Sequence, residues 1–242
     1  YLRKSGLASR GLVVGYDTRF ASEDFAAEVA QVTTASGIHT FLCSEAAPTP
    51  AVSYSIVHRG AGGGAIITAS HNPPQWNGFK YKPDYAGSAS PEVVEALEEE
   101  IAASLGAETP ILSLAEARER GFLTDIDPVA PYLACLDHLA DLPAIRGSGL
   151  SVVADAMYGA GAGYLPTLLE GGSIHVTEVH GERNPAFPGM AQPEPVAHNL
   201  TALSESVLSQ AADIGIALDG DADRLGVVDE KGEFISPLQA FA

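Results

Sequence analysis

An apolar run that leads straight into a polar loop occurs at residues 65–74, which read AIITASHNPP. The small and β-branched residues at its start predict a strand over residues 65–68. The loop that follows sets a hydroxyl, an imidazole and an amide side by side at Ser70, His71 and Asn72, and two prolines restrict its backbone. Loops at the carboxyl ends of strands bind ligands in open α/β sheets, so this run indicates both a fold class and a site.

Apolar and amphipathic segments alternate on both sides of this run. Strands are predicted at residues 12–16, 38–43, 65–68, 79–82, 151–154, 173–179, 213–218, 225–229 and 232–235. Helices are predicted at residues 23–36, 51–59, 92–104, 163–169 and 199–210. Such alternation is typical of mainly parallel sheets that are covered by helices on both faces.

The alternation occurs in two rounds, which predicts the α/β class with two three-layer α/β/α domains and mainly parallel, mixed sheets. The first domain is predicted at residues 1–127 and the second at residues 149–242. Residues 128–148 are the predicted connector, and a helix is expected at residues 128–142. Hydrophobic residues make up 46% of the 242 residues, which is enough for cores of this size.

The charge balance bears on partners and location. The formal net charge is −18, and no basic stripe is visible, so a nucleic-acid partner is not expected. We find no apolar run long enough to cross a bilayer, so no membrane partner is expected either. Cys43 and Cys135 lack a metal-type spacing and are expected to be buried free thiols. So few cysteines, with no leader visible, favour the cytoplasm. The oligomeric state is left open.

A second polar loop follows a buried strand at residues 219–224, which read DGDADR. The carboxylates of Asp219, Asp221 and Asp223 alternate along an extended loop, and such hard oxygen ligands suit Mg²⁺ or Ca²⁺. Without a cation this much negative charge would repel itself. The simpler alternative is an exposed acidic turn.

A calcium loop is a sharper alternative, because these aspartates and Glu230 occupy the acidic positions of the EF-hand spacing. Two observations oppose it. Arg224 stands where that loop needs glycine for a sharp turn, and residues 225–229 have the pattern of a strand rather than of an exiting helix. We therefore favour Mg²⁺.

Other polar residues accompany these loops. Arg19 follows the first strand and could clamp a phosphate with its planar fork, although a lone arginine in a turn is more often solvated. Asn77 and Lys80 follow the serine loop within the segment NGFK. Ser70 could act as a nucleophile or carry a phosphoryl group, but a polar turn would also explain its loop. The segment GAGAGY at residues 159–164 lacks the spaced third glycine of a dinucleotide loop.

Together, TASHNP at residues 68–73, NGFK at 77–80 and DGDADR at 219–224 strongly resemble the α-D-phosphohexomutase superfamily. The closest likeness is to phosphoglucomutases and phosphomannomutases, and it covers nearly the whole chain. The resemblance implies that Ser70 is phosphorylated. It also implies that Asp219, Asp221 and Asp223 bind Mg²⁺ together with an oxygen of the phosphoserine.

The resemblance further implies roles for the surrounding polar side chains. Arg19 and Lys80 match acid/base or phosphate-contacting groups, and His71 and Arg224 match residues that line the site. We expect Arg224, Asn72 and Asn77 to contact the substrate or its phosphate. Which group is the general base is left open.

The implied activity is an intramolecular phosphotransfer that interconverts hexose 1-phosphate and hexose 6-phosphate, of glucose or mannose. The phosphoserine enzyme would pass through a hexose 1,6-bisphosphate, which is also the expected activator, and the partner would be a phosphorylated sugar. The alternatives are a phosphoglucosamine mutase and a non-catalytic, metal-binding paralogue or fragment.

Some segments of the family are not found in this sequence. The opening Gly-Thr-x-Gly-x-Arg segment, the Gly-Glu-x-Ser-Gly sugar loop of the third domain and the Arg-x-Ser-Gly-Thr phosphate loop of the fourth are not present. We therefore expect only the first two domains in this chain, with sugar recognition mostly missing and little or no mutase activity from these residues alone.

One geometric expectation follows from a shared ion. Two ligands of one Mg²⁺ lie roughly 3 Å apart, so even with a loosened site the Ser70 hydroxyl should lie within about 8 Å of a carboxylate oxygen of the acidic loop. Arg19, His71 and Lys80 should border the same cleft.

Overall fold

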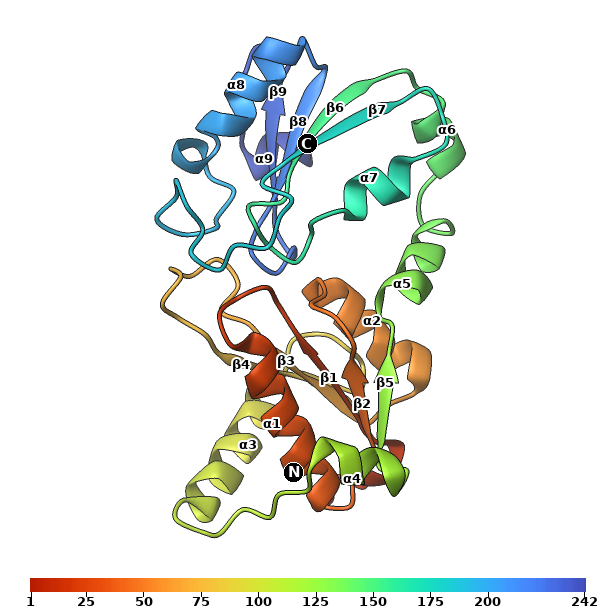
Figure 1. Cartoon of the computed structure of the whole chain (residues 1–242), viewed down its shortest axis with the longest axis vertical. Coiled ribbons are helices and arrows are strands. Elements are labelled where there is room, and N and C mark those ends of the chain that lie inside the picture. Colours follow the sequence, from red (N-terminus) through yellow and green to blue (C-terminus); the bar gives the residue numbers. More distant parts are fainter. The chain divides into compact units, whose positions relative to one another are not determined.

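The computed structural model describes residues 1–242, which form two compact units. The first unit comprises residues 1–16, 21–67 and 78–132, and the second comprises residues 17–20, 68–77 and 133–242. Each unit contains one five-stranded mixed sheet with helices packed against it, which confirms the predicted α/β class (Figure 1). No helix has the length and apolar character that a membrane span requires.

The sheet of the first unit has the strand order β4-β3-β1-β2-β5. Its strands are β1 (Leu12–Tyr16), β2 (Thr40–Cys43), β3 (Gly63–Ile67), β4 (Phe79–Pro83) and β5 (Leu123–Ile126). Its helices are η1 (Ala8–Arg10), α1 (Ser22–Ala35), α2 (Thr49–Arg59), α3 (Pro91–Ser104) and α4 (Leu114–Glu119). Neighbouring strands are parallel except for β4, which pairs with β3 in the antiparallel sense.

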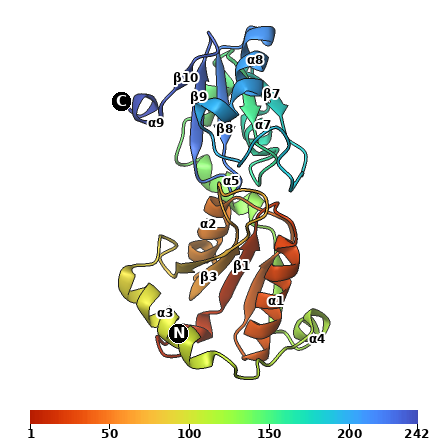
Figure 2. The same ribbon diagram turned by 90° about the vertical axis from the view of Figure 1, so that its left-hand side faces the viewer.

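Helices α1 and α2 cover opposite faces of this sheet (Figure 2). Ala26 and Ala30 of α1 pack into one apolar cluster, and Val52 and Ile56 of α2 pack into the other. Gly15 of β1 permits the close approach of α2, because a Cβ atom at Gly15 would lie 2.5 Å from a methyl group of Val52. The lack of a side chain at Gly15 therefore sets how closely α2 packs on the sheet.

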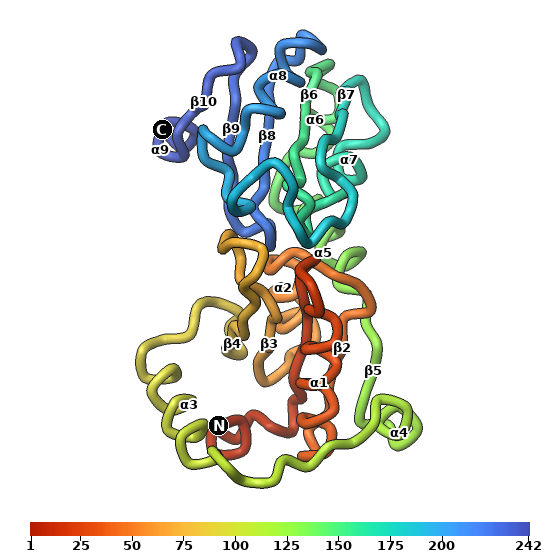
Figure 3. Tube along the Cα trace, turned by 60° about the vertical axis from the view of Figure 1, so that its left-hand side comes forward, coloured from red at the N-terminus to blue at the C-terminus, as the bar shows by residue number.

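The sheet of the second unit has the strand order β10-β9-β8-β6-β7 (Figure 3). Its strands are β6 (Ser151–Asp155), β7 (His175–Val179), β8 (Ile214–Leu218), β9 (Leu225–Asp229) and β10 (Phe234–Ile235). Its helices are α6 (Leu142–Arg146), α7 (Tyr164–Leu169), η2 (Ala197–Asn199), α8 (Thr201–Gln210) and α9 (Pro237–Ala240), and the unit boundary falls within α5 (Val129–Leu136). Strands β7, β6 and β8 are parallel to one another, whereas β9 pairs in the antiparallel sense with both β8 and β10.

Two apolar clusters hold this second sheet between its helices. Leu203 and Val207 of α8 pack into one cluster, and Leu142 of α6 and Leu169 of α7 pack into the other. Because β6, β7 and β8 run parallel, their carboxyl ends meet at one edge of the sheet. The loops that follow these strands are therefore neighbours, and they build the site described below.

Most predicted elements lie within two residues of the observed ones. The connector is an exception, because the helix predicted for residues 128–142 ends early: α5 stops at Leu136, and a separate helix, α6, begins at Leu142. The Asp141 carboxylate accepts the backbone N–H of Ala144 at 3.1 Å, and Pro143 lies in the first turn of α6, so a new helix begins there. The prediction of two buried cysteines is also wrong in part, since Cys135 is only half-buried.

Helix α4 and strand β5 were not predicted. Ser113 caps α4, because its hydroxyl accepts the backbone N–H of Glu116 at 3.3 Å and donates to the Glu116 carboxylate at 2.7 Å. Strand β5 then pairs with β2 and completes one edge of the sheet. Its four residues are too few and too polar to stand out as a strand in the sequence.

Candidate active site

The loop of residues 68–77 belongs to the second unit, although the strand before it belongs to the first. The backbone N–H of Ser70 donates to the hydroxyl oxygen of Thr68 at 2.8 Å, which closes a tight turn. Ser70 has a φ of +52°, in the left-handed region that few residues other than glycine adopt. This conformation is costly, and surrounding contacts must hold it.

The acidic loop begins directly after β8. One carboxylate oxygen of Asp219 accepts the backbone N–H groups of Asp223 at 2.9 Å and of Arg224 at 3.0 Å. Asp219 and Asp221 are fully buried, whereas Asp223 is exposed. Burial, with the nearby charges of Asp221 and Asp223, raises the pKa of Asp219 to about 7. The loop thus gathers three carboxylates, two of them buried, within five residues.

These three aspartates can hold a divalent cation. Each offers a carboxylate oxygen, and the oxygens lie within 4.8 Å of one another. Hard oxygen donors in this number suit Mg²⁺, which usually keeps further positions for water or phosphate oxygens. Burial, and then the neighbouring charges of Asp221 and Asp223, raise the pKa of Asp219, and a bound cation would act against both causes.

The serine loop and the acidic loop are in direct contact. The Ser70 hydroxyl donates to a carboxylate oxygen of Asp219 at 3.0 Å, which confirms the expected distance of within about 8 Å. His71 lies next to this pair, with its Nδ1 3.4 Å from the Ser70 hydroxyl oxygen. A hydroxyl, an imidazole and a candidate metal loop therefore converge within one unit.

Gly220 makes this contact possible. A Cβ atom at Gly220 would lie 2.5 Å from the carbonyl oxygen of Ser70, closer than any side chain tolerates. We expect Gly220→Ala to lower the unfolding free energy by about 1–3 kcal/mol, since one of the loops must shift. Amide hydrogen exchange should also rise in residues 68–77. Gly37→Ala is the control, because that site is open and its φ of +71° adds only backbone strain. Unchanged exchange in the serine loop would contradict the prediction.

Arg19 has its guanidinium group inside the serine loop. The two terminal nitrogens donate to the carbonyl oxygens of four loop residues, at 2.6–3.0 Å; these are Ser70, Asn72, Pro73 and Trp76. The side chain is 1% exposed. The sequence suggested a phosphate clamp or an acid/base group here, and the structure places this group on backbone carbonyls.

Three further side chains were predicted to belong to the site, namely Asn72, Asn77 and Lys80. The Asn72 side chain is exposed beside Ser70. Asn77 donates from its side-chain amide to the carbonyl oxygen of Phe20 at 3.2 Å, which ties the serine loop to residues 17–20. Lys80 lies on β4 of the first unit, opposite Ile66 of β3, so its role toward Ser70 stays a prediction.

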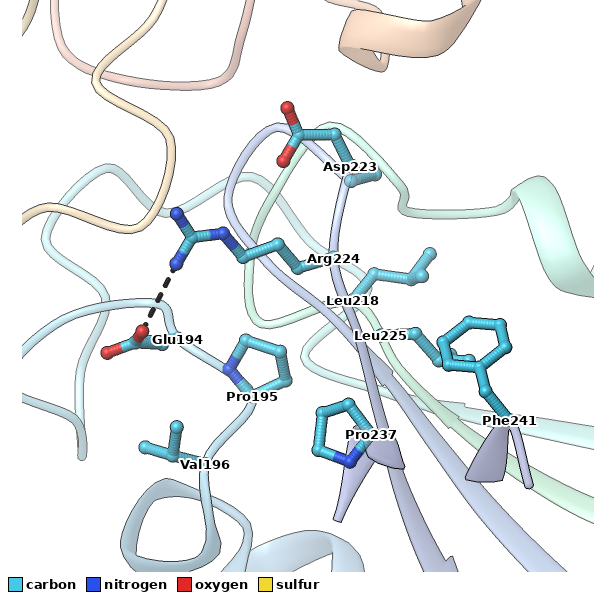
Figure 4. A pocket seen from close by; sticks show the side chains of 10 residues that line it. Glu194, Pro195, Val196, Leu218, Asp223, Arg224, Leu225, Pro237 and Phe241 are labelled. Carbon is cyan, nitrogen blue, oxygen red and sulfur yellow. Dashed lines mark hydrogen bonds and ion pairs between the residues drawn. The ribbon is translucent and has the colours of Figure 1, made fainter. Parts of the chain in front are cut away.

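Arg224 borders an open cavity of about 510 Å³ next to the acidic loop (Figure 4). Its guanidinium group lies 3.2 Å from the carboxylate of Glu194 and 4.0 Å from that of Asp219. The cavity is also lined by Asp223 and, on its apolar side, by Phe241. Arg224 remains 44% exposed, so it can reach an anion in the cavity.

The sequence did not reveal a second polar cluster at the ends of β6 and β7. The buried carboxylate of Asp155 lies 2.9 Å from Nδ1 of His180, and the same oxygen accepts the backbone N–H of Met157 at 2.8 Å. The hydrogen bond to Asp155 raises the pKa of His180. Met157 and His180 both have φ values in the left-handed region, at 46° and 50°. The cluster therefore fixes strained backbone at this edge of the sheet.

The raised pKa of His180 predicts that the stability of the chain depends on pH. This pKa is raised above the unfolded value, so the contribution of His180 is full at low pH and is lost as the pH rises through the folded pKa. Thermal unfolding should show His180→Asn to be less stable than the native chain by on the order of 1 kcal/mol near pH 5.5, with a smaller difference near pH 8.5. Asparagine tolerates the left-handed backbone. His175→Asn, at an exposed position, should show no such trend. A constant difference across this range would contradict the assignment.

Protein-family models and known proteins match this chain closely. The model for phosphoglucomutase/phosphomannomutase α/β/α domain I matches residues 1–107, and the model for domain II matches residues 130–232. A phosphoglucomutase/phosphomannomutase of Thermococcus kodakarensis is 36% identical over 246 residues, which cover 100% of this chain and 51% of that protein. A phosphoglucosamine mutase of Frankia alni is 34% identical over 243 residues, which cover 99% of this chain and 51% of that protein.

A solved structure has the same fold. The crystal structure of a Thermus thermophilus protein, assigned as a phosphomannomutase, superposes with a TM-score of 0.85 at 34% identity. The superposition covers 98% of this chain and 52% of that one. The chain thus spans about half the length of the relatives that it matches.

Proposed function

This chain belongs to the phosphoglucomutase/phosphomannomutase family, and from that membership we propose that it carries the phosphoserine and the metal loop of a hexose-phosphate mutase. The reaction is the interconversion of a hexose 1-phosphate and a hexose 6-phosphate through Ser70. One observation carries the proposal: the Ser70 hydroxyl lies 3.0 Å from a carboxylate of the acidic loop, although 149 residues separate them. An acidic turn without a role in the reaction would not require contact with a serine so far away in the sequence.

The transfer has two steps that are the reverse of one another. In the first, the bond between phosphorus and Ser70 Oγ breaks, a bond from phosphorus to the free sugar hydroxyl forms, and the hydroxyl proton passes to a base. The product is a hexose 1,6-bisphosphate. After the sugar reorients, Ser70 Oγ takes the other phosphoryl group and the sugar oxygen regains a proton. Both steps need donors for the charge on the phosphoryl oxygens.

Residues of both loops would supply these functions. Asp219, Asp221 and Asp223, with an oxygen of phospho-Ser70, would hold Mg²⁺, which neutralises charge on the transferred group when bound. His71 would exchange a proton with the Ser70 hydroxyl, a role that the 3.4 Å between its Nδ1 and the hydroxyl oxygen supports. Arg224 would bind the phosphate of the incoming sugar from the cavity wall.

Three further side chains have proposed roles. Asn72 and Asn77 would contact the substrate. For Lys80, which lies on β4 of the first unit, the resemblance to the family implies a phosphate-contacting or acid/base role.

An aminosugar phosphate is the second candidate substrate. A phosphoglucosamine mutase matches almost as well as a phosphoglucomutase/phosphomannomutase, at 34% against 36% identity. Glucose, mannose and glucosamine phosphates compared side by side with one enzyme would decide between the candidates. We keep the cytoplasm as the proposed location.

The half-reaction tests the proposed function directly. We expect the 242-residue chain with Mg²⁺ and glucose 1,6-bisphosphate to release at most one equivalent of glucose monophosphate, measured by ³¹P NMR. Sustained turnover of glucose 1-phosphate should be slight, because much of sugar recognition is proposed to lie outside these residues. Near-normal turnover by this chain would show that the recognition residues have been misplaced. Complete absence of monophosphate would count against Ser70 as the acceptor.

A further inference from the structure

Arg19 lies two residues after Asp17, in the short loop that follows β1. The Asp17 carboxylate accepts the backbone N–H of Arg19 at 3.0 Å through one oxygen. Its other oxygen lies 3.3 Å from Nε of Arg19, and both side chains are almost fully buried, at 0% and 1% exposure. The loop therefore contains an ion pair that is withdrawn from water.

The guanidinium group has no pair of terminal N–H groups left to bind a phosphate. One terminal nitrogen donates to the carbonyl oxygens of Ser70 and Asn72, at 2.7 and 2.6 Å. The other donates to those of Pro73 and Trp76, both at 3.0 Å. The remaining nitrogen, Nε, lies 3.3 Å from a buried carboxylate oxygen of Asp17, so four of the five N–H groups donate to carbonyl oxygens and the fifth lies beside a carboxylate.

Neighbouring residues close the space around this group. The guanidinium carbon lies over the ring of Phe187, 5.2 Å from the ring centroid, and Phe187 is fully buried. Arg183 donates to the carbonyl oxygens of Thr18 and Arg19 themselves, at 3.0 and 3.2 Å. A phosphate could reach Arg19 only after the serine loop and these contacts had opened.

From this arrangement we propose that Arg19 is a positioning residue that holds Ser70 in its reactive geometry and binds no phosphate. Ser70 needs such support, because its φ of +52° is strained for a residue with a side chain. Arg19 bonds the Ser70 carbonyl directly and fixes the loop at three further carbonyls. The catalytic part of the proposal rests on the proposed function of Ser70, whereas the burial of Arg19 does not.

The first experiment follows the rate of Ser70 phosphorylation. Arg19→Lys keeps the positive charge but cannot make the four carbonyl bonds. At saturating glucose 1,6-bisphosphate we expect the labelling rate per folded chain, with folding checked by circular dichroism, to fall roughly 100-fold. The half-saturating bisphosphate concentration should change less than about twofold. Arg120→Gln, an exposed arginine with side-chain exposure of 60%, is the matched control and should change neither value.

A loss of affinity with the maximal rate retained would overturn the proposal, since it is the result expected of a phosphate clamp. Loss of labelling in the unaltered chain would instead refute the proposed function of Ser70 and leave the placement of Arg19 to the second experiment.

The second experiment needs no variant, so it decides the question even if Arg19→Lys fails to fold. The native chain is treated with phenylglyoxal with and without inorganic phosphate, and the modified arginines are located by peptide mass spectrometry. We expect modification of Arg224, which is 44% exposed, and none of Arg19 in either condition. Modification of Arg19 that phosphate prevents would overturn the proposal.

Discussion

Ser70→Ala is expected to lose all phosphoryl label from glucose 1,6-bisphosphate, whereas the native chain takes up close to one phosphoryl group. The reason is positional. Ser70 is the hydroxyl that donates to the acidic loop, with its oxygen 3.0 Å from Asp219. A phosphoryl group on that oxygen would place its charge at the proposed metal ligands. Intact-mass and peptide mass spectrometry measure both the amount of label and its location.

The control for this prediction is Ser209→Ala, which removes an exposed hydroxyl and should label normally. Label on other residues of the native chain, with none on Ser70, would contradict the prediction. So would mutase turnover that survives Ser70→Ala in any longer protein that contains this chain. Partial labelling of Ser70 would still support it, because the amount depends on how well the bisphosphate binds.

Mg²⁺ should raise the melting temperature of the native chain, and Asp221→Asn should abolish most of that rise. At a Mg²⁺ concentration of about 100 times Kd, binding adds about 2.7 kcal/mol to the unfolding free energy. For a chain of this size that corresponds to roughly 5–10 °C. Asp221 is fully buried beside Asp219, so the Asn variant replaces one carboxylate of the proposed ligand set with a neutral amide.

Glu230→Gln is the matched control for the metal prediction, because the glutamate stands at the last acidic position of an EF-hand spacing. It should leave the Mg²⁺ effect unchanged. Thermal scans with Mg²⁺, Ca²⁺ and EDTA, on the native chain and both variants, make the measurement. A rise in melting temperature with Ca²⁺ that Glu230→Gln removes would instead support the calcium loop. Equal shifts in the native chain and Asp221→Asn would contradict the proposed ligand set.

Sequence patterns predicted every strand except β5, and both loops, because these features are local. The apolar run before Ser70 and the run before Asp219 each have a length and periodicity that can be read without a partner. Helix α4 carried a local signal as well: Ser113 and Glu116 have the spacing of a capping box. The signal was not enough to predict a helix, because α4 has only six residues and shows too little of the helical period.

The contacts between loops have no such local signal. Ser70 and Asp219 were expected to meet only because the chain resembles a known family. The role of Arg19 could not be predicted, because its partners are backbone carbonyls, which every sequence has, and because Phe187, which covers it, lies far along the chain. The bond between Asp155 and His180 is equally invisible, since it depends on the parallel pairing of β6 with β7.

The assignment of residues 17–20 and 68–77 to the second unit has a consequence for protein engineering. A chimaera that joins the first domain of one family member to the second domain of another, at a junction in the connector, would separate Arg19 and Ser70 from the Phe187, Arg183 and Gly220 with which they fit. Substitutions on the two sides of such a junction are therefore not independent. An exchangeable cassette would have to take both loops along with residues 133–242, which a single crossover cannot do.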